Sequence, residues 1–153
     1  MIEGNSENIY TLDNFIQEYG TEDLRVDAFH LKEVFFNPGM KHKIVVNGNN
    51  ISDKYASELE ENKRIITFNT KEYYKYRYNP KLLSYDIYGT TELWFFILMA
   101  NELYSITEFN LRKLVLYDAS IISKFNKMLE LDQEFLEINS MEIMKQTQSG
   151  GAT

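Results

Sequence analysis

The fold is decided by residues 84–100, which read SYDIYGTTELWFFILMA. The aromatic and aliphatic start of this stretch, Ser84–Tyr88, predicts a short strand that ends at the glycine after it. Thr90 and Thr91, with an acidic residue next in sequence, predict a helix start, because hydroxyl and carboxylate oxygens accept hydrogen bonds from the unpaired N–H groups of a first turn. We therefore expect a helix over residues 92–103.

This expected helix has no polar side. Residues 93–100 are apolar all round and include Trp94, the single tryptophan of the chain. A helix on the surface of a small domain has polar residues on its outer face, and soluble monomers seldom leave an apolar patch of this size bare. The helix must therefore be covered on every side, either by flanking segments of this chain or by another subunit.

Two further elements complete a β-α-α-β unit. Residues 105–109 predict a second, shorter helix, and the apolar run 114–117 predicts a closing strand. Asp118 or Ser120 then caps a further helix. The apolar side chains of that helix recur at helical spacing, at Ile121, Ile122, Phe125, Met128 and Leu129. A similar stripe follows between residues 135 and 144.

The N-terminal half predicts a mixture of helices and strands. A helix is expected at Leu12–Tyr19, with Thr11 as its cap and Gly20 as its end. The other expected elements are strands at 43–46 and 64–68, a turn at 47–50, a polar helix at 53–62, and a strand at 74–78 that places Tyr74, Tyr76 and Tyr78 on one face.

These elements predict an α+β fold with four segments. Residues 1–80 form an N-terminal α+β extension, and residues 81–117 contain the β-α-α-β unit. Residues 118–145 form a C-terminal helical segment. The small, polar residues 146–153 are expected to be disordered.

Composition and charge exclude several classes of function. The net charge is −7, with 16 Lys and Arg against 23 Asp and Glu, which argues against a general nucleic-acid-binding surface. There is no cysteine and there are only two histidines, His30 and His42. The chain therefore lacks the residues that thiolate sites and histidine-rich metal sites need as ligands. No glycine-rich phosphate loop occurs. We expect no metal, nucleotide or covalent cofactor.

Catalysis has little support in the sequence. The acidic residues Asp53, Glu58, Glu60 and Glu61 lie among lysines and arginines on an expected polar helix. They favour a solvated charged face, since a catalytic acid needs a pocket that shifts its pKa. His30 is not followed by a serine in a nucleophile-elbow pattern.

The N-terminus and the longest apolar run both argue against a membrane location. Residues 1–7 show no basic segment followed by an apolar stretch, so we expect no signal peptide. Residues 93–100 are far shorter than the roughly twenty residues that a membrane-spanning helix needs. The chain is expected to be made in the cytoplasm and to be kept there or assembled there into something larger.

Residues 77–94, RYNPKLLSYDIYGTTELW, carry a resemblance. Together with Asn101, Asn110 and the run at 114–116, they resemble a LysM domain. More specifically, the stretch is similar to the small LysM-bearing wedge subunit of the baseplates of contractile-tailed (myovirus-type) bacteriophages. The resemblance covers residues 77–117, and the other parts of the chain carry none.

Two departures from carbohydrate-binding LysM domains separate this chain from a sugar-binding module. The loop at 110–113 is short and has no glycine or proline, which alters one wall of the sugar groove. Helix positions that stay polar in a free LysM domain are here Phe95, Phe96, Leu98 and Met99. Both departures point towards protein binding.

The resemblance implies a structural component of the virion tail that clamps neighbouring baseplate wedge proteins together, is assembled in the host cytoplasm and is not an enzyme. The expected partner-binding edge lies at the strand–helix junction, where aromatic residues can bury a large area with few rotatable bonds. It consists of Tyr85, Tyr88, Thr90, Thr91, Trp94 and Phe95. Trp94 fits a core position equally well.

Two alternatives belong to other classes. A peptidoglycan-binding LysM module, such as a wall-anchoring accessory, would keep the fold and bind sugar chains. A small enzyme, such as a cell-wall hydrolase, would need an acid–base pair or a metal site that the sequence does not show. Retention on purified peptidoglycan distinguishes the sugar-binding module from the clamp.

Overall fold

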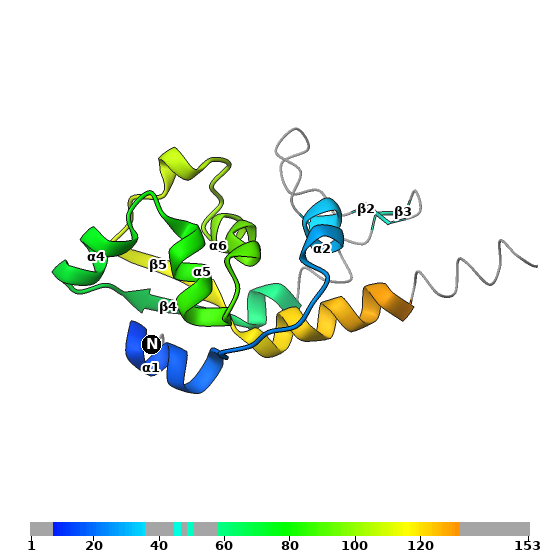
Figure 1. Ribbon diagram of the computed structural model, residues 1–153, viewed down its shortest axis with the longest axis horizontal. Coiled ribbons are helices and arrows are strands. Elements are labelled where there is room, and N and C mark those ends of the chain that lie inside the picture. The colour runs from blue at the N-terminus through cyan, green and yellow to red at the C-terminus, as the bar shows by residue number, and fades with distance from the viewer. Residues whose placement is uncertain (1–7, 36–44, 47–48, 51–57, 132–153) are drawn as a thin grey trace, which may run out of the picture. The chain divides into compact units, whose positions relative to one another are not determined.

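The computed structural model describes residues 8–35, 45–46, 49–50 and 58–131 (Figure 1). The chain divides into two compact units, residues 1–123 and 124–153. The second unit is described over residues 124–131 alone, which continue a helix that begins at residue 119. All further description concerns the first unit unless stated otherwise.

The fold is α+β, as the sequence predicts. In chain order the elements are β1 (Ile9–Thr11), α1 (Leu12–Tyr19), α2 (Ala28–Phe35), β2 (Val45–Val46), β3 (Asn49–Asn50), a helix at 58–61, β4 (Lys63–Thr67), α4 (Thr70–Tyr76), α5 (Pro80–Tyr88), η3 (Thr91–Leu93), α6 (Trp94–Ala100), η4 (Ile106–Glu108), β5 (Lys113–Tyr117) and a helix at 119–131.

A three-stranded sheet in the order β1-β4-β5 organises the unit. The central strand β4 pairs in parallel with β1 and antiparallel with β5, so that Ile65 lies between Ile9 and Val115. On the opposite face, Ile66 and Leu114 are fully buried. Helices α5 and α6 lie across the sheet beside β5 (Figure 1). The core therefore sits between one face of the sheet and these two helices.

Several predictions are confirmed. Helix α1 has the predicted bounds, its cap Thr11 accepts a hydrogen bond from Asn14 N–H at 3.2 Å, and it ends before Gly20. The predicted strands at 64–68 and 114–117 correspond to β4 and β5. Asp118, rather than Ser120, caps the helix that begins at residue 119, because its Oδ1 accepts the N–H of Ile121 at 2.9 Å.

The predicted strand at Ser84–Tyr88 is wrong, because these residues belong to helix α5. The ends of this helix explain the error. Asn79 accepts a hydrogen bond from the N–H of Leu82, and proline occupies the first helical turn, where its fixed φ suits a helix. Gly89 ends the helix with φ of +77°. These caps override the strand propensity of tyrosine and isoleucine.

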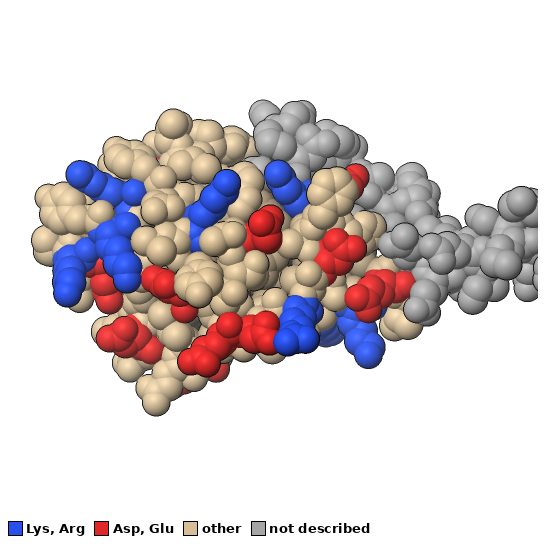
Figure 2. All heavy atoms as spheres, in the orientation of Figure 1, with Lys and Arg blue, Asp and Glu red and all other residues tan. Residues whose placement is uncertain are grey.

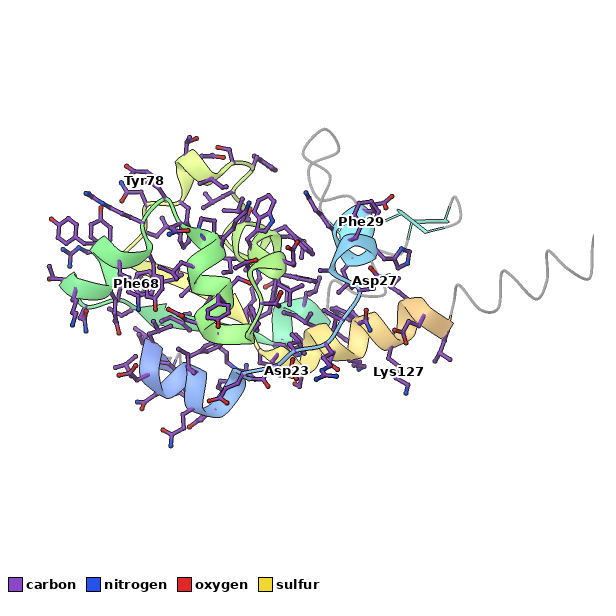
Figure 3. All side chains as sticks on the ribbon, viewed as in Figure 1. Asp23, Asp27, Phe29, Phe68, Tyr78 and Lys127 are labelled. Carbon is purple, nitrogen blue, oxygen red and sulfur yellow. The ribbon has the colours of Figure 1, made fainter. Side chains whose placement is uncertain are left out.

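The predicted strand at 74–78 is wrong for the same reason. Asn69 and Glu72 form a capping box that starts α4, in which each side chain accepts a backbone N–H of the other residue. The helix buries Tyr76 and leaves Tyr74 exposed, so the tyrosines do not share one face. Figure 3 shows Tyr78 at the same end of the unit as Phe68, whose ring stacks on that of Tyr76.

The strand that pairs with β5 is therefore β4, which lies upstream of both α4 and α5. The predicted β-α-α-β unit is corrected accordingly: its closing strand and its apolar helix are present, and its opening strand is at Lys63–Thr67 instead of 84–88. The pair β4–β5 joins residues on both sides of the expected boundary at residue 80. The rest of the expected segment division stays a prediction.

Smaller differences concern element ends. Helix α6 ends at Ala100 instead of residue 103, and the predicted helix at 105–109 is a single 3-10 turn, η4. Val45–Val46 is a strand, but Asn49–Asn50 forms its antiparallel partner instead of a turn. Residues 53–57, the stripe at 135–144 and the tail at 146–153 lie outside the described residues.

Candidate partner-binding surface

The apolar helix α6 is covered by its own chain. Every side chain from Phe95 to Ala100 is buried, and so is Leu93. Aromatic packing supplies part of this cover, since the ring of Phe96 lies edge-on to Tyr117 of β5 at 6.1 Å between centroids. Of the two possibilities for hiding this helix, flanking segments of the chain suffice, and no other subunit is needed for it.

The six predicted partner-binding residues separate into two groups. Tyr88 and Phe95 are both 0% exposed. Tyr85 is 56% exposed, Thr91 is exposed, and Thr90 and Trp94 are partly exposed. The fold therefore offers neither Tyr88 nor Phe95 to a partner, because both side chains are already used by the core. Partner binding by the other four stays a prediction.

The two buried residues have specific structural roles. The Tyr88 hydroxyl donates a hydrogen bond to the backbone carbonyl of Tyr117, which ties the end of α5 to the end of β5. Phe95 packs against Phe96, with 4.8 Å between ring centroids. Burial raises the pKa of the Tyr88 hydroxyl far above its usual value, so this group stays neutral and remains a hydrogen-bond donor at physiological pH.

The four exposed or partly exposed residues surround the junction between α5 and η3. The hydroxyl of Ser84 donates to the carbonyl oxygen of Thr90 at 2.6 Å, and the hydroxyl of Thr90 accepts the N–H of Glu92 at 3.2 Å. These bonds fix the path of the chain between the two helices. Trp94, at the start of α6, is thereby held at a defined position next to the junction.

A close backbone contact also fixes this junction. The N–H groups of Thr21 and Leu24 donate to the carbonyls of Ile87 and Tyr88 at 2.8 and 3.0 Å. Gly89 allows this approach, because a Cβ there would lie 1.9 Å from the carbonyl oxygen of Glu22. The segment that follows α1 thus satisfies the last carbonyls of α5.

Two lysines complete the surface around Trp94. The Nζ of Lys32, on α2, lies 5.1 Å from the centre of the Trp94 ring, and the Nζ of Lys81, on α5, lies 5.9 Å from it. Ammonium groups at these distances are attracted to the face of an indole. We call the set Lys32, Lys81, Tyr85, Thr90, Thr91 and Trp94 the Trp94 surface.

Sequence reasoning missed both lysines. Lys81 and Tyr85 are one turn apart on the exposed side of α5, a spacing that becomes visible once the stretch is assigned to a helix. Lys32 comes from an element far from Trp94 in sequence, and no local pattern links the two residues.

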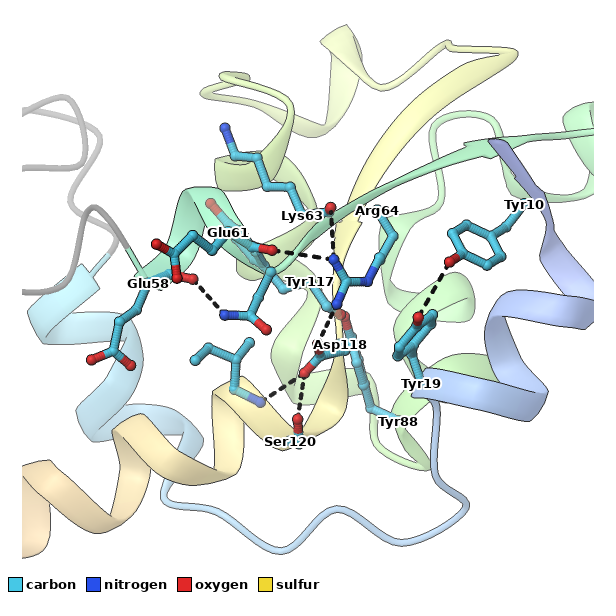
Figure 4. Close-up of polar contacts among 12 residues, drawn as sticks. Tyr10, Tyr19, Glu58, Glu61, Lys63, Arg64, Tyr88, Tyr117, Asp118 and Ser120 are labelled. Carbon is cyan, nitrogen blue, oxygen red and sulfur yellow. Dashed lines mark hydrogen bonds and ion pairs between the residues drawn. The ribbon is translucent and has the colours of Figure 1, made fainter. Parts of the chain in front are cut away.

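A second polar cluster lies where β4 meets the start of the helix at 119 (Figure 4). The Arg64 guanidinium lies 3.7 Å from the Asp118 carboxylate and 4.7 Å from the centre of the Tyr19 ring. Asp118 also accepts hydrogen bonds from the Ser120 hydroxyl and the Ile121 N–H. The arrangement joins a strand to a helix cap and satisfies a buried carboxylate, which is a structural role.

Among the described residues, no three His, Cys, Asp or Glu side chains gather closely enough to hold a metal ion. No helix among them is both long and apolar enough to span a membrane. His30 lies on α2, where its backbone N–H donates to Asp27 at 3.0 Å, while His42 lies outside the described residues.

Comparison with known families decides the class of the protein. Residues 31–137 match the family model described as Base plate wedge protein 53. The chain belongs to the base plate wedge protein 53 family. No curated protein and no solved structure matches the chain. The matched residues include every element from β2 to β5 and all members of the Trp94 surface.

Membership in the base plate wedge protein 53 family makes the chain a structural component of a bacteriophage baseplate. Its place is in the tail of the virion, and it assembles with other baseplate proteins. The family is a structural one and is not known for catalysis.

Proposed function

We propose that the chain clamps neighbouring wedge proteins together during assembly of a contractile phage tail, and that this assembly takes place in the host cytoplasm. Membership in the wedge family supports the setting. The observation that carries the clamp is the Trp94 surface, an indole flanked by two lysines, one of which lies one helical turn from a tyrosine that is 56% exposed.

The chemistry of this surface suits a binding hot spot. Trp and Tyr are enriched among the residues that dominate interface energies, since each buries a large area at the expense of few rotatable bonds. Lys32 and Lys81 lie beside the ring of Trp94 and place two cations next to the aromatic centre. The rim of threonine hydroxyls and lysines supplies polar groups around the aromatic centre.

The peptidoglycan-binding alternative has no comparable observation. The loop at 110–113, which would form one wall of a LysM-type sugar groove, is short and has no glycine or proline. We expect the purified chain not to be retained on purified peptidoglycan. Retention at a level comparable to that of a known LysM module would favour the sugar-binding function over the clamp.

The direct test is co-expression of the full chain with the wedge proteins encoded beside it, followed by size-exclusion chromatography. The wild-type chain is expected to elute with at least two different wedge proteins. Trp94→Ala and Tyr85→Ala are expected to release at least one of them, while Tyr104→Ala, which truncates another exposed tyrosine of this unit, keeps both. Failure of the wild-type chain to join any wedge protein would overturn the clamp.

A further inference from the structure

A second, distinct surface lies over α4 and the start of β5. Although the chain carries a net charge of −7, five of its 16 Lys and Arg residues lie on or directly beside α4 and the start of β5. Figure 2 shows Lys and Arg side chains clustered over the α4 end of the unit. The five are Lys71, Lys75, Arg77, Arg112 and Lys113.

Within this surface, tyrosine rings and guanidinium groups alternate. The Arg77 guanidinium carbon lies 4.7 Å from the centre of the Tyr74 ring and 6.0 Å from that of Tyr73. The Arg112 guanidinium carbon lies 4.7 Å from the same Tyr73 ring. We call Tyr74, Arg77, Tyr73 and Arg112 the Arg–Tyr ladder. Tyr73 is anchored in turn, because its hydroxyl donates to the side chain of Asn110.

The nearby carboxylates are already engaged elsewhere. Glu72 accepts the N–H of Asn69 in the capping box, and Asp86 accepts the hydroxyl of Tyr76 and lies 3.4 Å from the Lys75 ammonium. Among the residues that the structure describes, no carboxylate lies within 4.0 Å of either ladder arginine. The two guanidinium groups are thus ordered by tyrosine rings without being neutralised.

We propose that the Arg–Tyr ladder binds an acidic segment of a partner protein through its carboxylates. Stacking occupies the flat face of a guanidinium and leaves its N–H edge free, and that edge matches a carboxylate with two parallel hydrogen bonds. The stacked geometry reduces the rotamer freedom that binding would otherwise remove. This inference rests on the proposed function, since it states the chemistry of a second wedge-protein contact beyond the Trp94 surface.

A protein partner fits these observations better than a nucleic acid does. Binding of single-stranded nucleic acid uses open aromatic faces on which bases stack. Here the rings of Tyr73 and Tyr74 already carry guanidinium groups.

The test uses the full chain and two labelled probes, poly-L-glutamate and oligothymidylate, in fluorescence anisotropy titrations at low and high salt. Arg77→Gln with Arg112→Gln is expected to weaken poly-L-glutamate binding by at least about tenfold. The control is Arg25→Gln with Lys63→Gln, which removes the same charge from two cations already paired with Asp23 and Glu60. The affinity of the control for poly-L-glutamate is expected to stay within about twofold of wild type. This comparison is made after the affinities have been extrapolated to high salt, where the effect of net charge is screened.

Each outcome decides the proposal. Equal loss in the ladder variant and the control would overturn it, because binding would then follow net charge alone. Tighter binding of oligothymidylate than of poly-L-glutamate would replace the acidic protein by a nucleic acid. Circular dichroism of each variant shows whether it is folded. Arg77→Lys with Arg112→Lys keeps the charge, loses the bidentate edge and is expected to bind at an intermediate level.

Co-expression with the wedge proteins separates this inference from the proposed function. If the wild-type chain joins no wedge protein, the clamp fails, whatever the ladder binds in solution. If the wild-type chain joins them and the Arg77→Gln, Arg112→Gln variant does so with unchanged sensitivity to salt, the ladder proposal fails and the clamp stands. Selective loss of one wedge protein in the ladder variant supports both the clamp and the ladder proposal.

Discussion

Two tyrosines on α5 show how differently neighbouring aromatic residues are used. Tyr88 has no exposed surface and donates to a backbone carbonyl of β5, whereas Tyr85, less than one turn away, is 56% exposed. The helix separates them because its buried residues recur at positions 80, 83, 84, 87 and 88, a helical stripe that excludes Tyr85. Aromatic content alone therefore does not locate a partner surface.

The same contrast recurs at the start of α6. Phe95 is fully buried among other aromatic rings, while Trp94 lies partly exposed between two lysines. The stretch from Tyr85 to Phe95 thus supplies both core and surface. The two roles make different predictions, because a core truncation acts on folding and a surface truncation acts on assembly.

The largest expected effect is that of Phe95→Ser. Truncating a buried aromatic side chain lowers the free energy of unfolding by about 3–5 kcal/mol, because it removes buried apolar area and leaves a cavity. Thermal and urea unfolding monitored by circular dichroism would measure the loss. An unchanged melting temperature would show that Phe95 is not a core residue and would return it to the list of partner contacts.

A second core prediction concerns Asn101, which follows α6. Its side-chain amide donates to the carbonyl of Val115 and accepts the N–H of the same residue, both at 2.8 Å, and so substitutes for a missing strand at the outer edge of β5. Asn101→Leu leaves both backbone groups without a partner and is expected to destabilise the fold by about 2–4 kcal/mol. Asn14→Leu, at an exposed position of α1, is the matched control and is expected to change stability by less than about 0.5 kcal/mol.

Equal melting temperatures for the Asn101 and Asn14 variants would contradict this edge-capping role. Hydrogen exchange adds a local readout. The N–H of Val115 is expected to lose its protection in Asn101→Leu while the amides of the central strand β4 keep theirs, as long as the variant remains folded.

The sequence predicted the parts of the fold that depend on strong local signals. Helix α1 has both a cap and a terminating glycine, and β4 and β5 are short apolar runs, so these elements were predicted correctly. The apolar character of residues 93–100 also predicted correctly that α6 must be covered. Each of these inferences needs only information within a few residues.

The errors arose where two local signals conflict. Residues 84–88 and 74–78 have strand propensity, yet Asn79 with its following proline, Gly89, and the Asn69 capping box start or end helices around them. Caps satisfy backbone groups that propensity does not address, and here they decide the outcome. Lys32 next to Trp94 could not be predicted, because the contact joins elements far apart in sequence.

A third prediction concerns alkaline pH and the buried tyrosines. Burial raises the pKa of the Tyr88 and Tyr117 hydroxyls above the value of about 10 expected in the unfolded chain. Their contribution to stability is therefore fully present below pH 10 and is lost as the pH rises towards their folded-state pKa values. By pH 11 the free energy of unfolding is expected to fall by about 1 kcal/mol for each buried tyrosine.

Ultraviolet absorbance of tyrosinate measures this directly. Tyr88 and Tyr117 are expected to ionise only together with the loss of the circular dichroism signal. Ionisation of all eleven tyrosines in a single step before unfolding would contradict the burial of Tyr88 and Tyr117. The control is the same titration in concentrated urea, where one step near pH 10 is expected.

The smallest expected change in stability is that of Tyr85→Ala, and it tests the surface side of the comparison. Because Tyr85 lies on the exposed side of α5, its truncation is expected to alter the free energy of unfolding by less than about 0.5 kcal/mol. If the Trp94 surface binds a wedge protein, the same change weakens assembly by about 2 kcal/mol, close to thirtyfold in affinity. Unfolding experiments and co-purification on the same preparation measure both quantities. Tyr88→Ala is the buried counterpart and is expected to lower the free energy of unfolding. A Tyr85→Ala chain as stable as wild type that still assembles with undiminished affinity would remove Tyr85 from the interface, and a chain that fails to fold would place it in the core beside Tyr88.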